Sequence, residues 1–166
     1  MKEIDITPQG IYKEDEQIKK AREKALLFLS YGDHTVKSMY EKLTGAGFDK
    51  DICDTVIAYL VERKYINESD YLERFMRHCA YKKKYGRKRI ELAAYQKGFS
   101  KKVIGEIAEE VFCEIDFVEI CAERLQKTDI ADLTDKKKRD KIIASLMRSG
   151  FSLNEIKSAI NSLCDE

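Results

Sequence analysis

The feature that most constrains the fold of this chain is a Gly-Phe pair that occurs three times at nearly equal spacing. The pairs are Gly47-Phe48, Gly98-Phe99 and Gly150-Phe151, and their Phe residues are 51 and 52 positions apart. Counted from each Phe, the residues at −9, −5, +5, +8, +9 and +12 are apolar or small in every copy. The steps of 3, 1 and 3 after Phe follow one face of an α-helix. The pattern therefore predicts three copies of one helical unit rather than three unrelated helix pairs.

Each glycine of these pairs is expected to end a helix at positive φ, which glycine adopts at little steric cost. In the central copy, Gly86 opens a short helix with Ile90 and Ala94 on its apolar stripe, and Gly98 closes it. Ser100 then follows as a suitable N-cap for the next helix. Each copy is thus read as two short helices joined at the Gly-Phe turn, preceded by a third helix.

The composition of the whole chain is typical of a thin helical array. It is 43% hydrophobic and 37% charged, with one proline, Pro8, and strand-like alternation only at Ile4-Asp5-Ile6. The first helix is expected from about Glu14 to Tyr31. We predict an all-α fold of three tandem three-helix repeats that form an elongated, curved array. The predicted ranges are an N-terminal arm at 1–13 and repeats at 14–66, 67–112 and 113–166.

Cap residues predict where helices begin in the second and third repeats. The segment from Asn67 to Asp70 is expected to cap the first helix of repeat 2. In repeat 3, Thr134 is expected to cap the middle helix. Ser152 with Glu155 has the spacing of a capping box before the last helix.

The charge of the chain is distributed very unevenly, although the net charge is only +1. Residues 72–103 contain eleven Lys or Arg against two acids, whereas residues 104–135 contain two against ten. The densest run, 82–89, holds six cations in eight residues. A surface of this sign suits a polyanion or an acidic protein.

The cations of this central third are the candidate partner-binding residues. Guanidinium groups bind phosphate or carboxylate with two hydrogen bonds, and the neighbouring Tyr81 and Tyr85 supply rings that stack on bases. A solvated hinge between two helices is the alternative interpretation, and a nuclear-localisation tract is a further pattern match. The candidates are Arg74, Arg77, Lys82, Lys83, Lys84, Arg87, Lys88, Arg89, Lys97 and Lys101.

No catalytic or metal-binding motif stands out from the sequence. Phosphate-binding loops, nucleophile elbows and zinc-protease motifs are missing, and the only histidines are His34 and His78. His78 and Cys79 are neighbours on one expected helix, so their side chains point in different directions. We therefore predict a protein that is not an enzyme and needs no cofactor or metal. Five cysteines without a Cys-x-x-Cys pair, no secretory signal and no membrane-length apolar run predict a cytoplasmic protein.

Several short segments, in this order and at this spacing, match one known family: Ala25-Leu26, Leu29-Ser30-Tyr31, Tyr40-Glu41-Lys42-Leu43, Gly47-Phe48, Asn67-Glu68-Ser69-Asp70-Tyr71, Gly86-Arg87-Lys88-Arg89-Ile90 and Gln96-Lys97-Gly98-Phe99. With them the sequence resembles the RecX family of bacterial regulators of the RecA recombinase. The resemblance covers residues 18–112 well and the third repeat more loosely. It implies an all-α protein that binds RecA filaments on single-stranded DNA and modulates, usually inhibits, their growth, ATPase and strand exchange. The implied context is homologous recombination, DNA repair and the SOS response, and we expect a monomer.

The chain departs from the family pattern at three places. The turn after the first helix is Gly32-Asp33-His34-Thr35, where family members commonly have flanking Arg and Ser. Asn67-Glu68 replaces the usual paired aspartates, and Arg87 stands where a proline often follows the glycine. These departures put the details of partner contacts in doubt and leave the fold prediction intact.

Two other classes of function remain open at the level of sequence. A tandem helical DNA-binding protein could act without RecA, with Arg87, Lys88 and Arg89 at the start of a recognition-like helix that binds DNA phosphates directly. A protein adaptor would instead bind its partner through the acidic third and ignore nucleic acid. Binding to bare DNA, to free RecA and to RecA on single-stranded DNA distinguishes the three.

Overall fold

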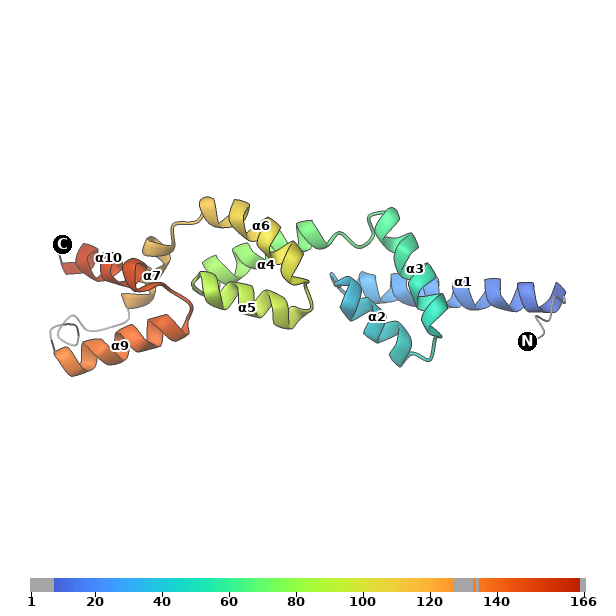
Figure 1. Cartoon of the computed structure of the whole chain (residues 1–166), viewed down its shortest axis with the longest axis horizontal. Coiled ribbons are helices and arrows are strands. Elements are labelled where there is room, and N and C mark those ends of the chain that lie inside the picture. Colours follow the sequence, from blue (N-terminus) through green and yellow to red (C-terminus); the bar gives the residue numbers. More distant parts are fainter. Residues whose placement is uncertain (1–7, 127–132, 134, 165–166) are drawn as a thin grey trace. The chain divides into compact units, whose positions relative to one another are not determined.

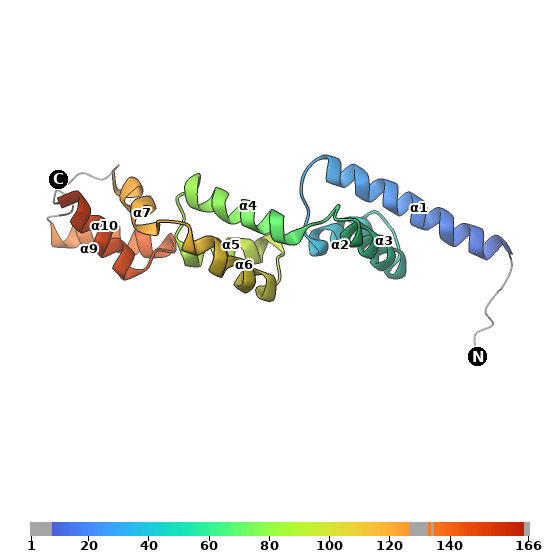
Figure 2. The same cartoon turned by 90° about the horizontal axis from the view of Figure 1, so that it is seen from above.

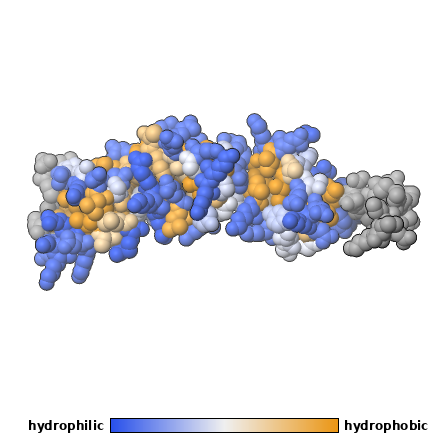
Figure 3. Space-filling model, in the orientation of Figure 1, coloured by the Kyte–Doolittle hydropathy of each residue, from blue (hydrophilic) through white to orange (hydrophobic). Residues whose placement is uncertain are grey.

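The computed structural model describes residues 8–126, 133 and 135–164 (Figures 1 and 2). All regular secondary structure in these ranges is α-helical, so the all-α prediction is confirmed for this part of the chain. The chain forms two compact units, residues 1–68 and 69–166. On the face shown in Figure 3, each unit carries apolar residues among many hydrophilic ones, as expected for small helical units.

The first unit contains α1 (Pro8–Ser30), α2 (Val36–Gly45) and α3 (Lys50–Glu62), which pack against one another. Its core centres on Ala21, Ala25, Met39, Leu43 and Leu60, which are fully buried. The buried Thr35 caps α2 by accepting a hydrogen bond from the Ser38 amide at 3.1 Å. The two shorter helices, α2 with 10 residues and α3 with 13, depend on this packing, because isolated helices of such length are marginal in water.

The first helix begins earlier than the sequence pattern suggested. α1 starts at Pro8, whereas we expected an arm to residue 13 and a helix from about Glu14. Proline is well tolerated in the first turn of a helix, because its missing N–H would have no intrahelical partner there. Pro8 was therefore wrongly read as part of a turn.

The second unit contains α4 (Glu68–Tyr81), α5 (Arg87–Lys97), α6 (Lys101–Cys113), α7 (Phe117–Leu125), α9 (Lys136–Arg148) and α10 (Leu153–Cys164). α10 packs against α7 and α9, and α5 packs against α6. Buried side chains from all six helices form one continuous core. The proposed second and third repeats thus share a core, and the boundary between them stays a prediction.

The Gly-Phe turns have the conformation that the sequence predicted. Gly47, Gly98 and Gly150 have φ of 91°, 105° and 95°. In each turn the Phe N–H donates to the carbonyl five residues earlier, at 3.2 to 3.3 Å, which is the bond of a Schellman motif. The aligned apolar positions are buried or partly buried in all three copies; they are Met39, Ile90, Ile142, Leu43, Ala94, Leu146, Cys53, Ile104, Ile156, Val56, Ile107, Ala159, Ile57, Ala108, Ile160, Leu60, Val111 and Leu163.

The caps of the third repeat match the sequence in part. Ser152 and Glu155 form the predicted capping box, with the Glu155 amide 3.2 Å from Ser152 Oγ and the Ser152 amide 2.7 Å from Glu155 Oε2. The N-cap of α9 is Asp135, whose side chain accepts from the Lys138 amide at 2.9 Å. Thr134, the expected cap, lies outside the described residues.

Candidate partner-binding surface

The basic turn, residues 82–89, comprises the connection from α4 to α5 and the first three residues of α5, and it is held by backbone contacts. Lys84 has a positive φ of 53°, and the Tyr85 amide donates to the Cys79 carbonyl at 3.1 Å. The Gly86 amide then donates to the Ser149 carbonyl at 2.9 Å, so the turn is hydrogen-bonded to the end of α9. These contacts fix the path of the backbone from which the six cations project.

Gly86 and Gly150 bring the two backbones into direct contact. A Cβ at Gly86 would overlap the backbone of Gly150 and Phe151, and a Cβ at Gly150 would overlap the backbone of Arg89. The Lys88 amide also donates to the Gly150 carbonyl, at 3.3 Å. The start of α5 is therefore positioned against the α9–α10 turn by two residues without side chains.

Arg77, Lys84 and Arg87 are paired with carboxylates of the second unit. Arg77 lies between Glu114, at 2.6 Å, and Glu73, at 3.0 Å, and these hydrogen bonds raise the pKa of its guanidinium. Lys84 forms an ion pair with Glu123. The charges of Arg77 and Lys84 are therefore compensated by carboxylates of the chain itself.

Arg87 is held by a carboxylate and by aromatic rings. Its Nε is 3.1 Å from Glu155 Oε1, and Glu155 is the capping-box residue of α10, with only 14% of its side chain exposed. The guanidinium carbon also lies 4.4 Å from the centre of the buried Phe117 ring. Arg87 thus combines a charge-assisted hydrogen bond with a cation–π contact, and it connects α5 to α10 and α7.

The other candidate cations project into solvent. The Lys83 Nζ and the Arg89 Cζ lie 6.0 and 5.6 Å from the centre of the Tyr85 ring. The Lys101 Nζ lies 5.7 Å from the centre of the Tyr95 ring. Arg74 donates to the Asp70 carbonyl at 3.3 Å. Six exposed candidates take part in no ion pair with any residue that the structure describes: Lys82, Lys83, Lys88, Arg89, Lys97 and Lys101.

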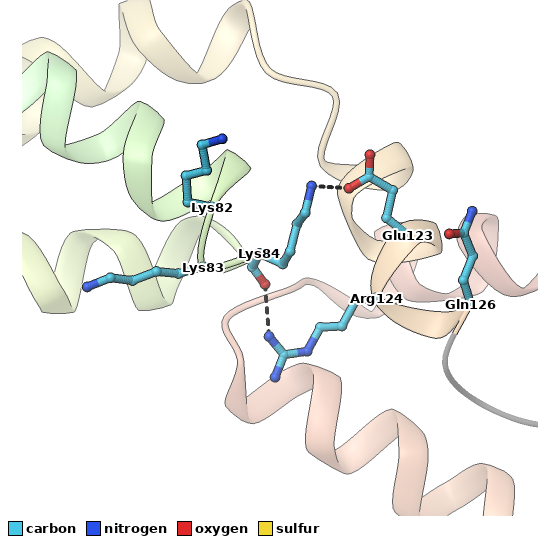
Figure 4. A pocket seen from close by; sticks show the side chains of 6 residues that line it. All are labelled: Lys82, Lys83, Lys84, Glu123, Arg124 and Gln126. Carbon is cyan, nitrogen blue, oxygen red and sulfur yellow. Dashed lines mark hydrogen bonds and ion pairs between the residues drawn. The ribbon is translucent and has the colours of Figure 1, made fainter.

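A groove of about 790 Å³ opens beside the basic turn, between it and the end of α7 (Figure 4). Lys84 points to Glu123 across the groove, and Arg124 Nη1 donates to the Lys84 carbonyl at 3.0 Å. Lys83 extends away from these contacts. The groove is therefore lined by the paired Lys84 and by two lysines, Lys82 and Lys83, that form no ion pair with any described residue.

Comparison with known proteins shows the family. A family model described as "RecX, first three-helix domain" matches residues 21–60, which lie in the first unit. "Regulatory protein RecX" of Clostridioides difficile is 30% identical over 151 residues, covering 90% of this chain and 71% of the relative. The chain belongs to the RecX family. The RecX regulatory protein of Clostridium tetani is 28% identical over 167 residues, covering 97% of this chain and 75% of the relative.

A RecX crystal structure supports the same assignment. The crystal structure of RecX from Lactobacillus salivarius is 26% identical, covers 92% of this chain and 99% of that chain, and has a TM-score of 0.82. The RecX-like glycine at position 86 now has a structural role in the contact with Gly150. Arg87, a departure from the RecX pattern, is one of the cations held within the fold.

The sequence analysis did not include one basic run among the candidate binding residues. Lys136, Lys137, Lys138 and Arg139 are consecutive and exposed in the first turn of α9. Cations at a helix N-terminus oppose the helix dipole, so this run adds nothing to the stability of α9. The run of four cations could have been found by the same charge count that singled out the basic turn.

The described residues contain few groups that could bind a metal ion or act as a nucleophile. Within it, no three His, Cys, Asp or Glu side chains are close enough together to hold a metal ion. Cys79 is buried while its neighbour His78 is exposed, which confirms that the two side chains point apart. Burial raises the pKa of Cys121 to about 11. Within the described ranges, no helix is long and apolar enough to cross a lipid bilayer.

Proposed function

We propose that this chain is a non-catalytic regulator of the RecA recombinase. It binds RecA filaments on single-stranded DNA and inhibits their growth, ATPase and strand exchange during homologous recombination, DNA repair and the SOS response. It acts in the cytoplasm as a monomer, without a cofactor, and its structural units are the repeats at 14–66, 67–112 and 113–166. Membership of the RecX family supports the regulatory role.

The main support for this binding surface is a set of cations on the basic turn that have no carboxylate partner among the described residues. Lys82, Lys83, Lys88 and Arg89 are exposed, and the backbone that presents them is fixed by the Gly86 contact. A preorganised cluster of this kind binds DNA phosphate or a carboxylate-rich protein surface through charge-assisted hydrogen bonds, each worth about 1.5–3 kcal/mol. The cations on the turn therefore contact the filament in this proposal, while Arg77, Lys84 and Arg87 maintain the fold.

The test is charge reversal at the exposed members alone, Lys83→Glu, Lys88→Glu and Arg89→Glu. The variant should fold like the wild type, because exposed substitutions usually change stability by no more than about 0.5 kcal/mol each. Inhibition of RecA-driven strand exchange and ATP hydrolysis should be lost. The matched variant carries Lys136→Glu, Lys137→Glu and Lys141→Glu on α9, which gives the same change of net charge at other exposed positions.

The two variants together locate the surface. Loss of inhibition in the basic-turn variant alone supports the proposal. Equal loss in both would indicate a dependence on net charge, and loss in the α9 variant alone would move the surface to α9. If neither variant is impaired, the basic turn is a solvated hinge.

A second measurement separates the other classes of function. Binding of the wild-type chain is compared on bare DNA, on free RecA and on RecA bound to single-stranded DNA. Preference for the RecA–DNA filament supports regulation of RecA. Equal binding to bare DNA favours a DNA-binding protein that acts alone, and binding to free RecA or another protein without DNA favours an adaptor.

A further inference from the structure

A second cluster of cations and aromatic rings lies in the first unit, at the end of α3. The guanidinium carbons of Arg22 and Arg63 lie 5.3 and 5.6 Å from the centre of the Tyr59 ring. Tyr65 stacks on the same ring, with the centres 6.4 Å apart and the planes inclined by 27°. Residues 22 and 65 are thus brought together by the packing of α1 against α3.

The turn that presents Tyr65 has a costly backbone conformation. α3 ends in the same motif as the Gly-Phe turns, with the Lys64 amide 3.0 Å from the Val61 carbonyl and the Tyr65 amide 2.8 Å from the Leu60 carbonyl. Here Lys64, rather than glycine, takes the left-handed position, at φ 58°. A side chain at this φ is strained, so Lys64 is a poorer choice for stability than glycine.

Tyr65 also differs from its counterparts in exposure. The residue after the left-handed position usually packs on its own helix, and Phe99 and Phe151 are 1% and 2% exposed. Tyr65 is 54% exposed. The turn therefore holds the Tyr65 ring at the surface, stacked on Tyr59. Arg22 and Arg63 lie against the Tyr59 ring, and Lys64 precedes Tyr65 in the chain.

We propose that Tyr65 and Tyr59, with Arg22, Arg63 and Lys64, form a stacking platform for an unpaired base of single-stranded nucleic acid. An exposed aromatic face suits a planar group, and the three cations suit the phosphates on either side of it. A cationic ligand is disfavoured by the same charges. Among the described side chains, none forms an ion pair with Arg22 or Arg63. Double-stranded DNA is also unsuited, because its bases are already stacked and paired.

This platform is separate from the basic turn, which lies in the other unit, and it does not depend on RecA. The experiment uses the full chain and bare oligonucleotides. Since the chain contains no tryptophan, Tyr65→Trp places a single tryptophan on the platform, and it can be excited at wavelengths where tyrosine does not absorb. We expect oligo(dT) to quench its emission, and neither an abasic oligonucleotide of equal length nor a duplex to do so. Quenching by the abasic strand, or none by oligo(dT), overturns the proposal.

Substitutions distinguish stacking from a merely structural role. Tyr65→Ala should weaken binding of oligo(dT) about 10-fold, since stacking is worth about 1–3 kcal/mol per base, whereas Tyr65→Phe should bind like the wild type. Lys64→Gly should raise the melting temperature of the first unit and weaken binding a few-fold. The proposal is wrong if Tyr65→Ala binds oligo(dT) with unchanged affinity. It is also wrong if Lys64→Gly is stabilised and still binds with wild-type affinity at low salt.

Discussion

The contact between Gly86 and Gly150 allows backbone strain and steric overlap to be measured separately. Gly86 has φ −80° and ψ 169°, which suit any residue, but its Cβ would overlap another backbone. Gly47 is the opposite case, with φ 91° and open space around its Cβ. Gly105 lies inside α6 with open space and no left-handed backbone. Gly86→Ala therefore tests steric overlap alone, and Gly47→Ala tests backbone strain alone. Gly105→Ala introduces neither effect and serves as the control.

The expected magnitudes follow from these environments. Gly105→Ala should stabilise by about 0.5–1 kcal/mol, because alanine is the better helix former. Gly47→Ala should cost about 1 kcal/mol through its positive φ. Gly86→Ala must separate α5 from the α9–α10 turn. Overpacking of about 1–3 kcal/mol and two backbone hydrogen bonds of about 1 kcal/mol each add to a cost of about 3–5 kcal/mol.

The assay is urea unfolding followed by circular dichroism, with hydrogen exchange to assign each transition to a unit. Gly86→Ala should lower the midpoint of the second unit, and Gly47→Ala that of the first. A loss below about 1 kcal/mol for Gly86→Ala would contradict the backbone contact. If Gly105→Ala lowered the free energy of unfolding as much as Gly86→Ala does, alanine at any glycine would destabilise the fold, and the steric explanation would fail.

Four further results are expected from stability and labelling measurements. Lys64→Gly should raise the free energy of unfolding of the first unit by about 1 kcal/mol, by relieving a left-handed lysine. Arg87→Gln should cost about 1–2 kcal/mol through loss of its ion pair and ring contact, whereas Lys102→Gln, whose pair with Glu106 is exposed and 4.0 Å long, should cost almost nothing. Maleimide should label the exposed Cys113 at pH 7 and leave Cys121 unreacted. Since burial raises the pKa of Cys121 from about 9 to about 11, the unfolded chain loses this proton first, and stability should fall as the pH rises from 9 to 11.

The parts of this fold that the sequence predicted are those governed by short-range rules. A glycine at a helix end and a Ser-x-x-Glu box act within a few residues, so the φ values of Gly47 and Gly98 and the box at Ser152 were readable in advance. Apolar spacing likewise identified which faces are buried. The start of α1 at Pro8 was missed because proline is common both in turns and at helix starts.

The candidate site was predicted less completely, because charge compensation depends on contacts between distant positions. Glu123 is 39 residues from Lys84, and Glu155 is 68 residues from Arg87. Nothing in the basic run itself separates these paired cations from the exposed Lys83 or Lys88. The platform at Tyr59 could not be predicted from the sequence either, because Arg22 lies on α1 and Tyr59 on α3, and only the packing of these helices brings them together.

The contact between Gly86 and Gly150 also bears on how such a chain can gain or lose repeats. A cut between α6 and α7 would leave the amides of Gly86 and Lys88 without acceptors and would divide the core that the second unit shares. Residues 69–166 therefore form one structural unit, and duplication or deletion of a single repeat within them would have to rebuild this joint. The boundary near residues 68 and 69 separates two cores, so we expect a change of chain length at that place to disturb neither of them.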